Sequence, residues 1–154
     1  MGACRGLNLI LGIGPSIYLL EGAIFLALVP VCYIAGITLL SRGEVFGGER
    51  QNATVSLGLI SAAFLGLLSL GWSDRFNFFS FLPFFLFLTI RVYPPFWRAF
   101  LNPRPELIRT AVGAGVLSLI LLNAAIAGGY GGFFYGLGIS LLLPLTVQMK
   151  EWVT

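Results

Sequence analysis

Long apolar segments separated by short polar breaks run through the whole chain. A helix needs about 20 apolar residues to cross about 30 Å of hydrocarbon. Because the connections are short, 154 residues hold at most about six such helices. The pattern predicts an all-α, polytopic membrane bundle of about five to six transmembrane helices in a single domain, 1–154. The expected spans are about 3–20, 22–40, 53–71, 76–100, 105–127 and 133–149.

Small residues recur along the third segment at spacings of four, four and three, which places them on one helix face. We expect this face to pack closely against another helix. Its members are Gly58, Ala62, Gly66 and Ser69.

Two other segments have a distinctive composition. The fourth opens with seven phenylalanines in twelve residues, FNFFSFLPFFLF. We expect these rings to face lipid or neighbouring helices, and a tunnel wall for an isoprenoid chain is the alternative. Between the fifth and sixth segments, four glycines predict an uncharged loop. They are Gly128, Gly129, Gly131 and Gly132.

Composition supports the membrane class and shortens the list of chemistries. Hydrophobic residues make up 58% of the chain and charged residues only 10%, too few to cover the surface of a soluble domain. Histidine is absent from the sequence, which excludes Ser/His and Cys/His catalysis and His-ligated metals. Cys4 and Cys32 lie in apolar surroundings without CxxC spacing, so we interpret them as packed thiols.

The basic residues are unevenly distributed between the two sides of a six-span chain. Eight of the nine lie on the side of both termini, and only Arg75 lies on the other. Because short loops rich in Lys and Arg stay cytoplasmic, we expect both termini in the cytoplasm. We expect contact with membrane lipid and none with nucleic acid. The eight are Arg5, Arg42, Arg50, Arg91, Arg98, Arg104, Arg109 and Lys150.

Residues 41–51 form the most polar interruption, with four charges and three glycines. One interpretation is a solvated loop that holds a helix end at the headgroups. The other is one rim of a site for an anionic headgroup or a diphosphate. Arg91 lies inside its predicted span, so it must snorkel, pair or face a wet cavity. The candidate ligand-binding residues are Arg5, Asn8, Ser41, Arg42, Glu44, Glu49, Arg50 and Arg91.

Four segments together suggest a family. They read GACRGLNLILG, PVCYIAGITLLSRGEVFGG, RVYPPFWRAFLNPRPELIRTAVGAGVLSLILLNAA and YGLGISLLLPL. In these segments the chain resembles the second half of UbiA-superfamily membrane prenyltransferases, and in particular the UbiA-like EboC group. The resemblance covers nearly the whole chain and implies a UbiA-like helical half bundle.

The resemblance also implies a chemistry. In that family two acidic motifs, NDxxDxxxD and DxxxD, bind a prenyl diphosphate through Mg²⁺, and the prenyl group is transferred to an aromatic or other lipophilic acceptor. Ser41 stands where the first Asp of the second motif would be, and Glu44 is the carboxylate near the second. The resemblance therefore implies a catalytic role for Glu44 and Arg42 on the diphosphate side, with Glu44 as a metal ligand.

The sequence differs from that family in its acidic residues. Asp74 is the only aspartate in the chain, so NDxxDxxxD is absent. Glu44 with Glu49 could supply at most half of a magnesium site. We expect the C-terminal half of a prenyltransferase that is inactive alone. Either a second membrane chain carries the N-terminal half, or the chain is a fragment, or this branch has lost or changed the chemistry. A non-catalytic scaffold or subunit of a membrane complex is the alternative, and a small transporter has little support.

Overall fold

The computed structural model describes residues 20–44, 50–74 and 76–144, which are helical apart from short connections. The expectation of an all-helical chain is confirmed for these residues, and no strand occurs among them. The helices are α2 (Leu20–Ser41), α3 (Arg50–Ser69), a 3₁₀ turn (Leu70–Trp72), α4 (Phe78–Leu101), α5 (Pro105–Leu117), α6 (Leu119–Gly131) and α7 (Phe133–Ser140).

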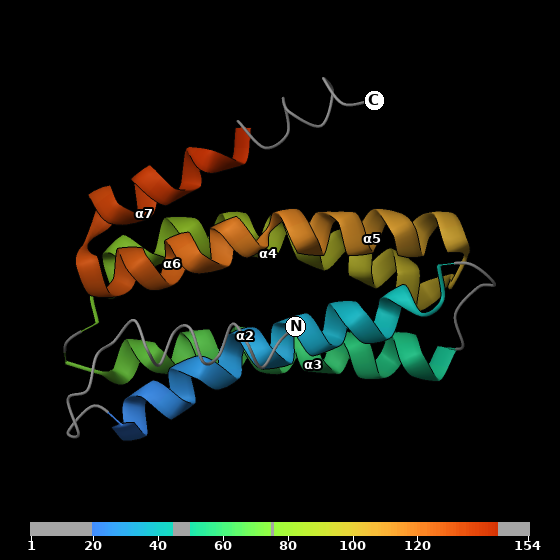
Figure 1. The fold of residues 1–154 in the computed structure, drawn as a ribbon, viewed down its shortest axis with the longest axis horizontal. Coiled ribbons are helices and arrows are strands. Elements are labelled where there is room, and N and C mark those ends of the chain that lie inside the picture. The colour runs from blue at the N-terminus through green and yellow to red at the C-terminus, as the bar shows by residue number, and fades with distance from the viewer. Residues whose placement is uncertain (1–19, 45–49, 75, 145–154) are drawn as a thin grey trace.

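The helices form two antiparallel hairpins that lie against each other (Figure 1). One hairpin consists of α2 and α3. The other consists of α4 and the rod made by α5 and α6. Contacts between α2 and α5, and between α3 and α4, join the hairpins, while α7 packs on α6 and α4. With α5 and α6 taken as one rod, successive segments run in opposite directions, so alternate connections between them lie at the same end of the bundle.

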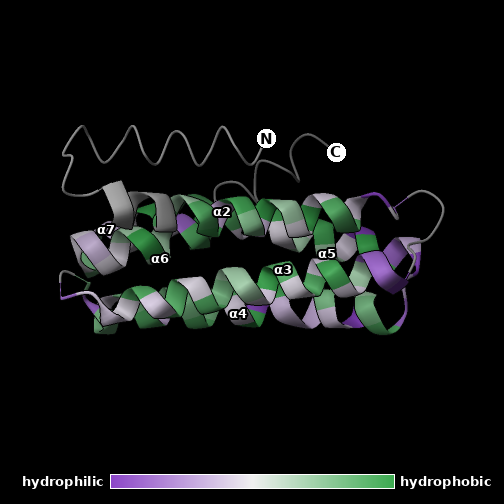
Figure 2. Ribbon diagram, turned by 90° about the horizontal axis from the view of Figure 1, so that it is seen from below, coloured by the Kyte–Doolittle hydropathy of each residue, from purple (hydrophilic) through white to green (hydrophobic). Residues whose placement is uncertain are grey.

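Three helical stretches are long and apolar enough to cross a membrane: Arg50–Trp72, Phe78–Leu101 and Pro105–Gly131. Two shorter apolar stretches, Leu26–Ser41 and Phe133–Pro144, accompany them. In Figure 2 hydrophobic residues cover the lengths of the helices, and the most hydrophilic residues gather at their ends. The first predicted span, 3–20, lies outside the described residues except for Leu20.

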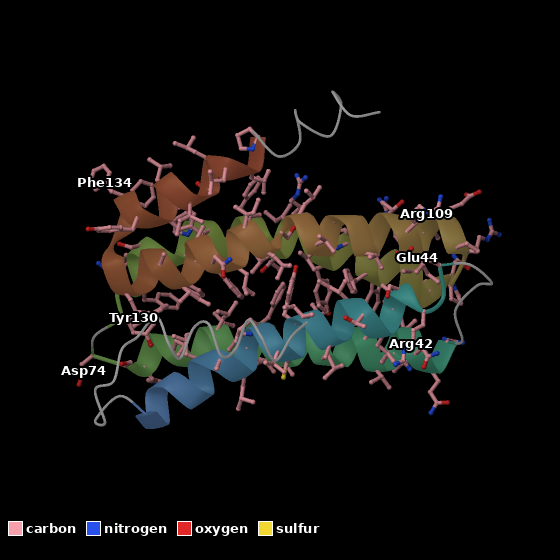
Figure 3. The ribbon with its side chains drawn as sticks, in the orientation of Figure 1. Arg42, Glu44, Asp74, Arg109, Tyr130 and Phe134 are labelled. Carbon is pink, nitrogen blue, oxygen red and sulfur yellow. The ribbon has the colours of Figure 1, made fainter. Side chains whose placement is uncertain are left out.

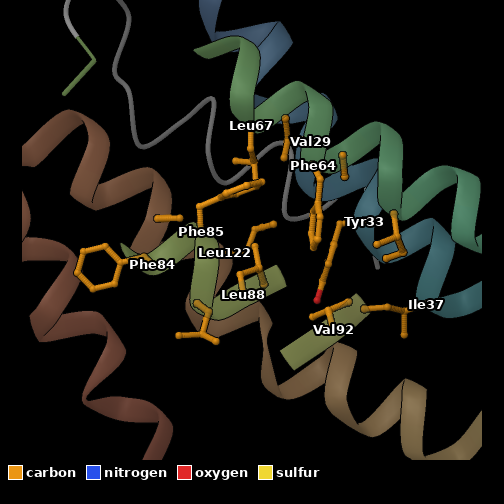
Figure 4. Packing of buried hydrophobic residues seen from close by; sticks show 14 of the residues in the cluster. Val29, Tyr33, Ile37, Phe64, Leu67, Phe84, Phe85, Leu88, Val92 and Leu122 are labelled. Atoms are coloured by element: carbon orange, nitrogen blue, oxygen red, sulfur yellow. The ribbon is translucent and has the colours of Figure 1, made fainter. Parts of the chain in front are cut away.

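Aromatic rings fill the space between the two hairpins. Tyr33, Phe81 and Phe96 are among the largest fully buried side chains. The Phe85 ring lies 5.1 Å from that of Phe81 and 5.6 Å from that of Phe64, centroid to centroid. Figure 4 shows this packing. The phenylalanines at the start of α4 thus divide between the core and the surface, with Phe78, Phe79 and Phe87 exposed.

The backbones of α2 and α3 approach closely at Gly36. A Cβ added there would lie 3.1 Å from the Ile60 Cγ1 atom and 3.1 Å from the Ser56 carbonyl oxygen. The buried Ser56 hydroxyl donates a 2.6 Å hydrogen bond to the Gly36 carbonyl. Small residues allow this contact, and the hydroxyl then links the two backbones directly.

The small-residue face predicted for the third segment is only partly used in packing. Gly66 contacts Val29 of α2, but a Cβ added at Gly58 would meet nothing within 4 Å, and Ala62 is exposed. The described helices therefore do not use Gly58 and Ala62 for the predicted packing. The close contact with α2 falls instead on the neighbouring face, which carries Ser56.

The predicted glycine loop is also wrong, because α6 continues through Gly131. Only Gly132 takes a left-handed backbone angle, φ 96°, at the turn into α7. Gly128 and Gly129 are helical, and aromatic rings from α4 and from the connection before it lie against their bare backbones. An added Cβ would meet Phe84 at Gly128 and overlap Phe76 at Gly129. Gly128 and Gly129 therefore allow close packing and do not form a turn.

The fifth predicted span is divided at Ser118, between α5 and α6. In an uninterrupted helix the Leu119 N–H would bond to the Gly115 carbonyl. Here the buried Tyr33 hydroxyl of α2 donates a 3.0 Å hydrogen bond to that carbonyl. A side chain from one hairpin therefore satisfies the backbone of the other where its helix is interrupted.

Enlarging Gly36 should separate α2 from α3. We expect Gly36→Leu to lower the free energy of unfolding by about 1–3 kcal/mol, because the new side chain overlaps Ile60 and the Ser56 backbone. Gly58→Leu is the matched control, since it adds the same side chain to a neighbouring helix where nothing lies within 4 Å. Unfolding of the purified chain in mixed micelles measures both. Equal losses in the two variants would contradict the close contact at Gly36.

Candidate functional site

The fold gathers most of the described charges at one end of the bundle. The α2–α3 and α4–α5 connections both lie there, because alternate connections share an end (Figure 1). Figure 3 places Arg42, Glu44 and Arg109 at this end and Asp74 at the opposite one. We call this end the basic end. Its described charged residues are Arg42, Glu44, Arg50, Arg98, Arg104, Glu106 and Arg109.

The arginines at the basic end are exposed and available to a ligand. All five are exposed, and they outnumber the two glutamates. No ion pair joins these charged side chains in the described part of the chain. Five unpaired guanidinium groups around two carboxylates favour an anion with several oxygen atoms, such as a phosphate or diphosphate.

The last turn of α2 positions the predicted catalytic residues. The Ser41 hydroxyl donates to the Thr38 carbonyl at 2.8 Å, within its own helix. The Gly43 N–H donates to the Leu40 carbonyl and the Glu44 N–H to the Ser41 carbonyl, both at 3.1 Å, so the chain remains tightly turned through Glu44. Glu44 is half-buried and Arg42 is exposed. The structure thus brings Ser41, Arg42 and Glu44 to one helix end.

The remaining predicted ligand-binding residues lie in different places. Arg50 begins α3 at the basic end, where its guanidinium carbon lies 5.8 Å from the centroid of the Phe100 ring. Arg5, Asn8 and Glu49 lie outside the described residues.

Arg91 lies within α4, ten residues before its end at Leu101. At 1.5 Å per residue this is about 15 Å inside the helix end. The residue is half-buried, and its Nε atom is buried without a hydrogen-bond partner among the described residues. An unpaired guanidinium at this depth is costly in hydrocarbon, which distinguishes Arg91 from the arginines of the basic end.

The described residues show no cluster of acidic side chains of the kind that holds a metal ion. Mg²⁺ takes oxygen ligands and is held through one or two carboxylates together with substrate phosphates. No group of three or more Asp, Glu, His or Cys side chains comes together anywhere in the described ranges. Glu44 is the only described carboxylate on the 41–51 stretch, and its predicted companion Glu49 falls in the gap between α2 and α3.

Three interior polar groups were missed by sequence reasoning: the hydroxyls of Tyr33, Ser56 and Ser118. The first two link helices across the core. The Ser118 hydroxyl is buried at the α5–α6 junction and has no hydrogen-bond partner among the described residues. The sequence does not indicate which helix a serine or tyrosine within an apolar segment will face. The positions of these hydroxyls could therefore not be predicted from residue spacing.

Comparisons with known proteins identify no relative: no family description, curated protein or solved structure matches this chain.

Removing the charge of Arg91 should not destabilise the bundle. Since the guanidinium is partly desolvated and Nε is unpaired, we expect Arg91→Met to leave the free energy of unfolding unchanged or to raise it by about 1 kcal/mol. Unfolding in mixed micelles is the measurement, with Arg98→Met at an exposed position of the same helix as control. A loss of about 3 kcal/mol or more for Arg91→Met alone would reveal a buried ion pair.

Proposed function

We propose that the chain is a multi-pass membrane protein whose basic end binds the diphosphate of a prenyl substrate, as one half of a UbiA-like prenyltransferase. The observation that carries the proposal is the gathering of five exposed, unpaired arginines at one end of an otherwise apolar bundle. A prenyl diphosphate has the matching chemistry, because its anionic head suits arginine and its chain suits an apolar helix surface.

In this proposal Arg42 and Glu44 are the diphosphate-side residues, with Ser41, Arg50 and Arg91 as further contacts. The described carboxylates do not build a magnesium site, so the proposal assigns the metal-binding aspartates to a second chain or to a preceding half. The lipophilic or aromatic acceptor would meet the prenyl group between the two halves. This arrangement explains why the chain carries arginines but lacks the acidic motifs of the family that it resembles.

A second candidate function is a non-catalytic membrane scaffold. Gly58 and Ala62 support it, since they lie on the outer side of α3 with open space at Gly58. Exposed small residues at a spacing of four allow a second helix to approach closely within a membrane. In a scaffold of this kind, the basic end would only anchor the bundle at the lipid headgroups.

Prenyl diphosphate binding separates the two functions. We expect the purified chain in detergent to bind radiolabelled geranylgeranyl diphosphate, and Arg42→Gln to weaken this binding about fivefold to fiftyfold, as expected for loss of a charge-assisted hydrogen bond. Glu44→Gln should abolish any magnesium dependence of binding. Asp74→Asn, at the opposite end, is the control. Absence of binding, together with co-purification of a second membrane protein that Gly58→Leu abolishes, would instead favour the scaffold.

We further propose that the basic end faces the cytoplasm, because arginine-rich short loops are retained there. In a background with Cys4 and Cys32 replaced by serine, a membrane-impermeant maleimide should label Ser73→Cys in intact cells. It should label Asn102→Cys only after permeabilisation. Ser73 and Asn102 are exposed and lie at opposite ends of α4. The reverse pattern would overturn the orientation, and equal labelling of both in intact cells would overturn the bilayer placement.

A further inference from the structure

Arg91 carries a charge near the middle of a helix that is long and apolar enough to cross a membrane. It lies 13 residues after Phe78 and ten before Leu101, or about 20 Å and about 15 Å from the two ends of α4. Arginine side chains near helix ends reach the headgroups by snorkelling. Because Arg91 lies much deeper, a partner inside the membrane is the less costly way to satisfy its charge.

The described part of the chain supplies no such partner. The Nε atom of Arg91 is buried without a hydrogen-bond partner, and no ion pair of this side chain occurs among the described residues. The described carboxylates lie at the two ends of the bundle, Glu44 and Glu106 at the basic end and Asp74 at the opposite one. None of them lies beside the middle of α4, so the charge of Arg91 is not neutralised by these groups.

Arg91 lies at the edge of a surface of α4 that the described helices leave open. Helix spacing places Phe87, Pro94 and Arg98 on its side of the helix, at i−4, i+3 and i+7. All three are exposed, whereas Arg91 is half-buried. We call these four residues the Arg91 face. A segment that packs on this face meets Phe87 and Pro94 on either side of the guanidinium-bearing residue.

Two prolines add a second polar feature at the same depth. Pro94 and Pro95 have no N–H, so the carbonyls of Ile90 and Arg91 lack the donors that an α-helix supplies at i+4. Ile90 is 68% exposed and Pro94 is exposed, so this break reaches the outer surface of α4. Within a membrane such carbonyls are tolerated where neighbouring helices, hydroxyl groups or water satisfy them. The surface around Arg91 is therefore better suited to protein than to lipid chains.

We propose that the Arg91 face docks a transmembrane helix of a second membrane chain, and that this helix places an Asp or Glu carboxylate on the Arg91 guanidinium. Charge complementarity selects this occupant, because a carboxylate pairs with a guanidinium through two parallel hydrogen bonds, whereas a purely apolar helix would leave it unpaired. A second copy of this chain fits less well, since its described carboxylates lie at its ends.

The inference rests on the part of the proposed function in which the chain spans a bilayer beside a second membrane chain. It names the contact that joins the two chains. A guanidinium has five N–H donors and the carboxylate uses two of them, so the diphosphate-side contact proposed for Arg91 is retained.

Model transmembrane peptides test the docking contact. The probe is a lysine-flanked helix of about 20 Leu and Ala residues with one central Glu, compared with the same helix carrying a central Gln. The chain, with Cys4 and Cys32 replaced by serine and a fluorophore on Asn102→Cys, is reconstituted with acceptor-labelled peptide in phosphatidylcholine vesicles. We expect energy transfer to show at least about tenfold tighter association of the Glu peptide. Arg91→Met should abolish this preference, and Arg91→Lys should retain part of it.

Two controls separate the contact from general attraction between charges. Arg98→Met removes a charge from the same face near the end of α4 and should keep the preference. A Glu moved seven residues toward one end of the peptide, about 10 Å from the depth of Arg91, should reduce it. Equal association of the Glu and Gln peptides, an undiminished preference in Arg91→Met, or an equal loss in Arg98→Met would overturn the docking contact. Unfolding in mixed micelles verifies that each variant is folded.

The result is distinguishable from the test of the proposed function. Geranylgeranyl diphosphate binding is measured without any peptide, so its absence would remove the diphosphate site. A preference for the Glu peptide that depends on Arg91 would still support the docking contact. Equal association of the two peptides together with intact diphosphate binding would remove the docking contact alone.

Discussion

Close contact between helix backbones is the constraint on which this bundle depends. In hydrocarbon, apolar side chains gain little by moving from lipid to protein, so helices associate through tight packing and hydrogen bonds. At Gly36 the contact with α3 is tight enough for the Ser56 hydroxyl to reach the α2 backbone. At the other hairpin Phe84 and Phe76 occupy the space that side chains at Gly128 and Gly129 would take. The closest helix contacts thus match glycine positions to particular aromatic or hydroxyl groups.

The antiparallel packing of the helices determines where the charged residues lie. Because the helices alternate in direction and are apolar along their lengths, the polar connections fall at the two ends, and arginines concentrate at one of them. Arg91 is the exception, held inside α4 with an unpaired Nε. The proposed diphosphate site draws on this asymmetry at the end of α2.

Hydropathy alone predicted that the described residues are helical, because apolar runs can be recognised without knowledge of their neighbours. Of the six predicted spans, three correspond to described stretches long and apolar enough to cross a membrane. Hydropathy could not predict the division at Ser118 or the helical state of Gly128 and Gly129, where other parts of the chain contact the backbone. It also could not predict the outward orientation of Gly58, which depends on which face of α3 packs on α2. The grouping of Arg42, Glu44 and Arg109 follows from the order of the helices and was accessible from sequence. The hydrogen bonds of the buried Tyr33 and Ser56 hydroxyls were not, because hydropathy does not specify which side chain reaches which carbonyl.

The division at Ser118 has a consequence for how the bundle is assembled. With 13 residues each, α5 and α6 are about 20 Å long, and neither alone crosses the hydrocarbon of the proposed bilayer. They must enter as one unit, which brings the interrupted backbone near Gly115 into an environment without water. The hydroxyl that satisfies the Gly115 carbonyl belongs to Tyr33, 82 residues earlier in the chain. The interrupted backbone of the second hairpin therefore gains this hydrogen bond only when the first hairpin lies against it, which couples the two hairpins through groups that are distant in sequence.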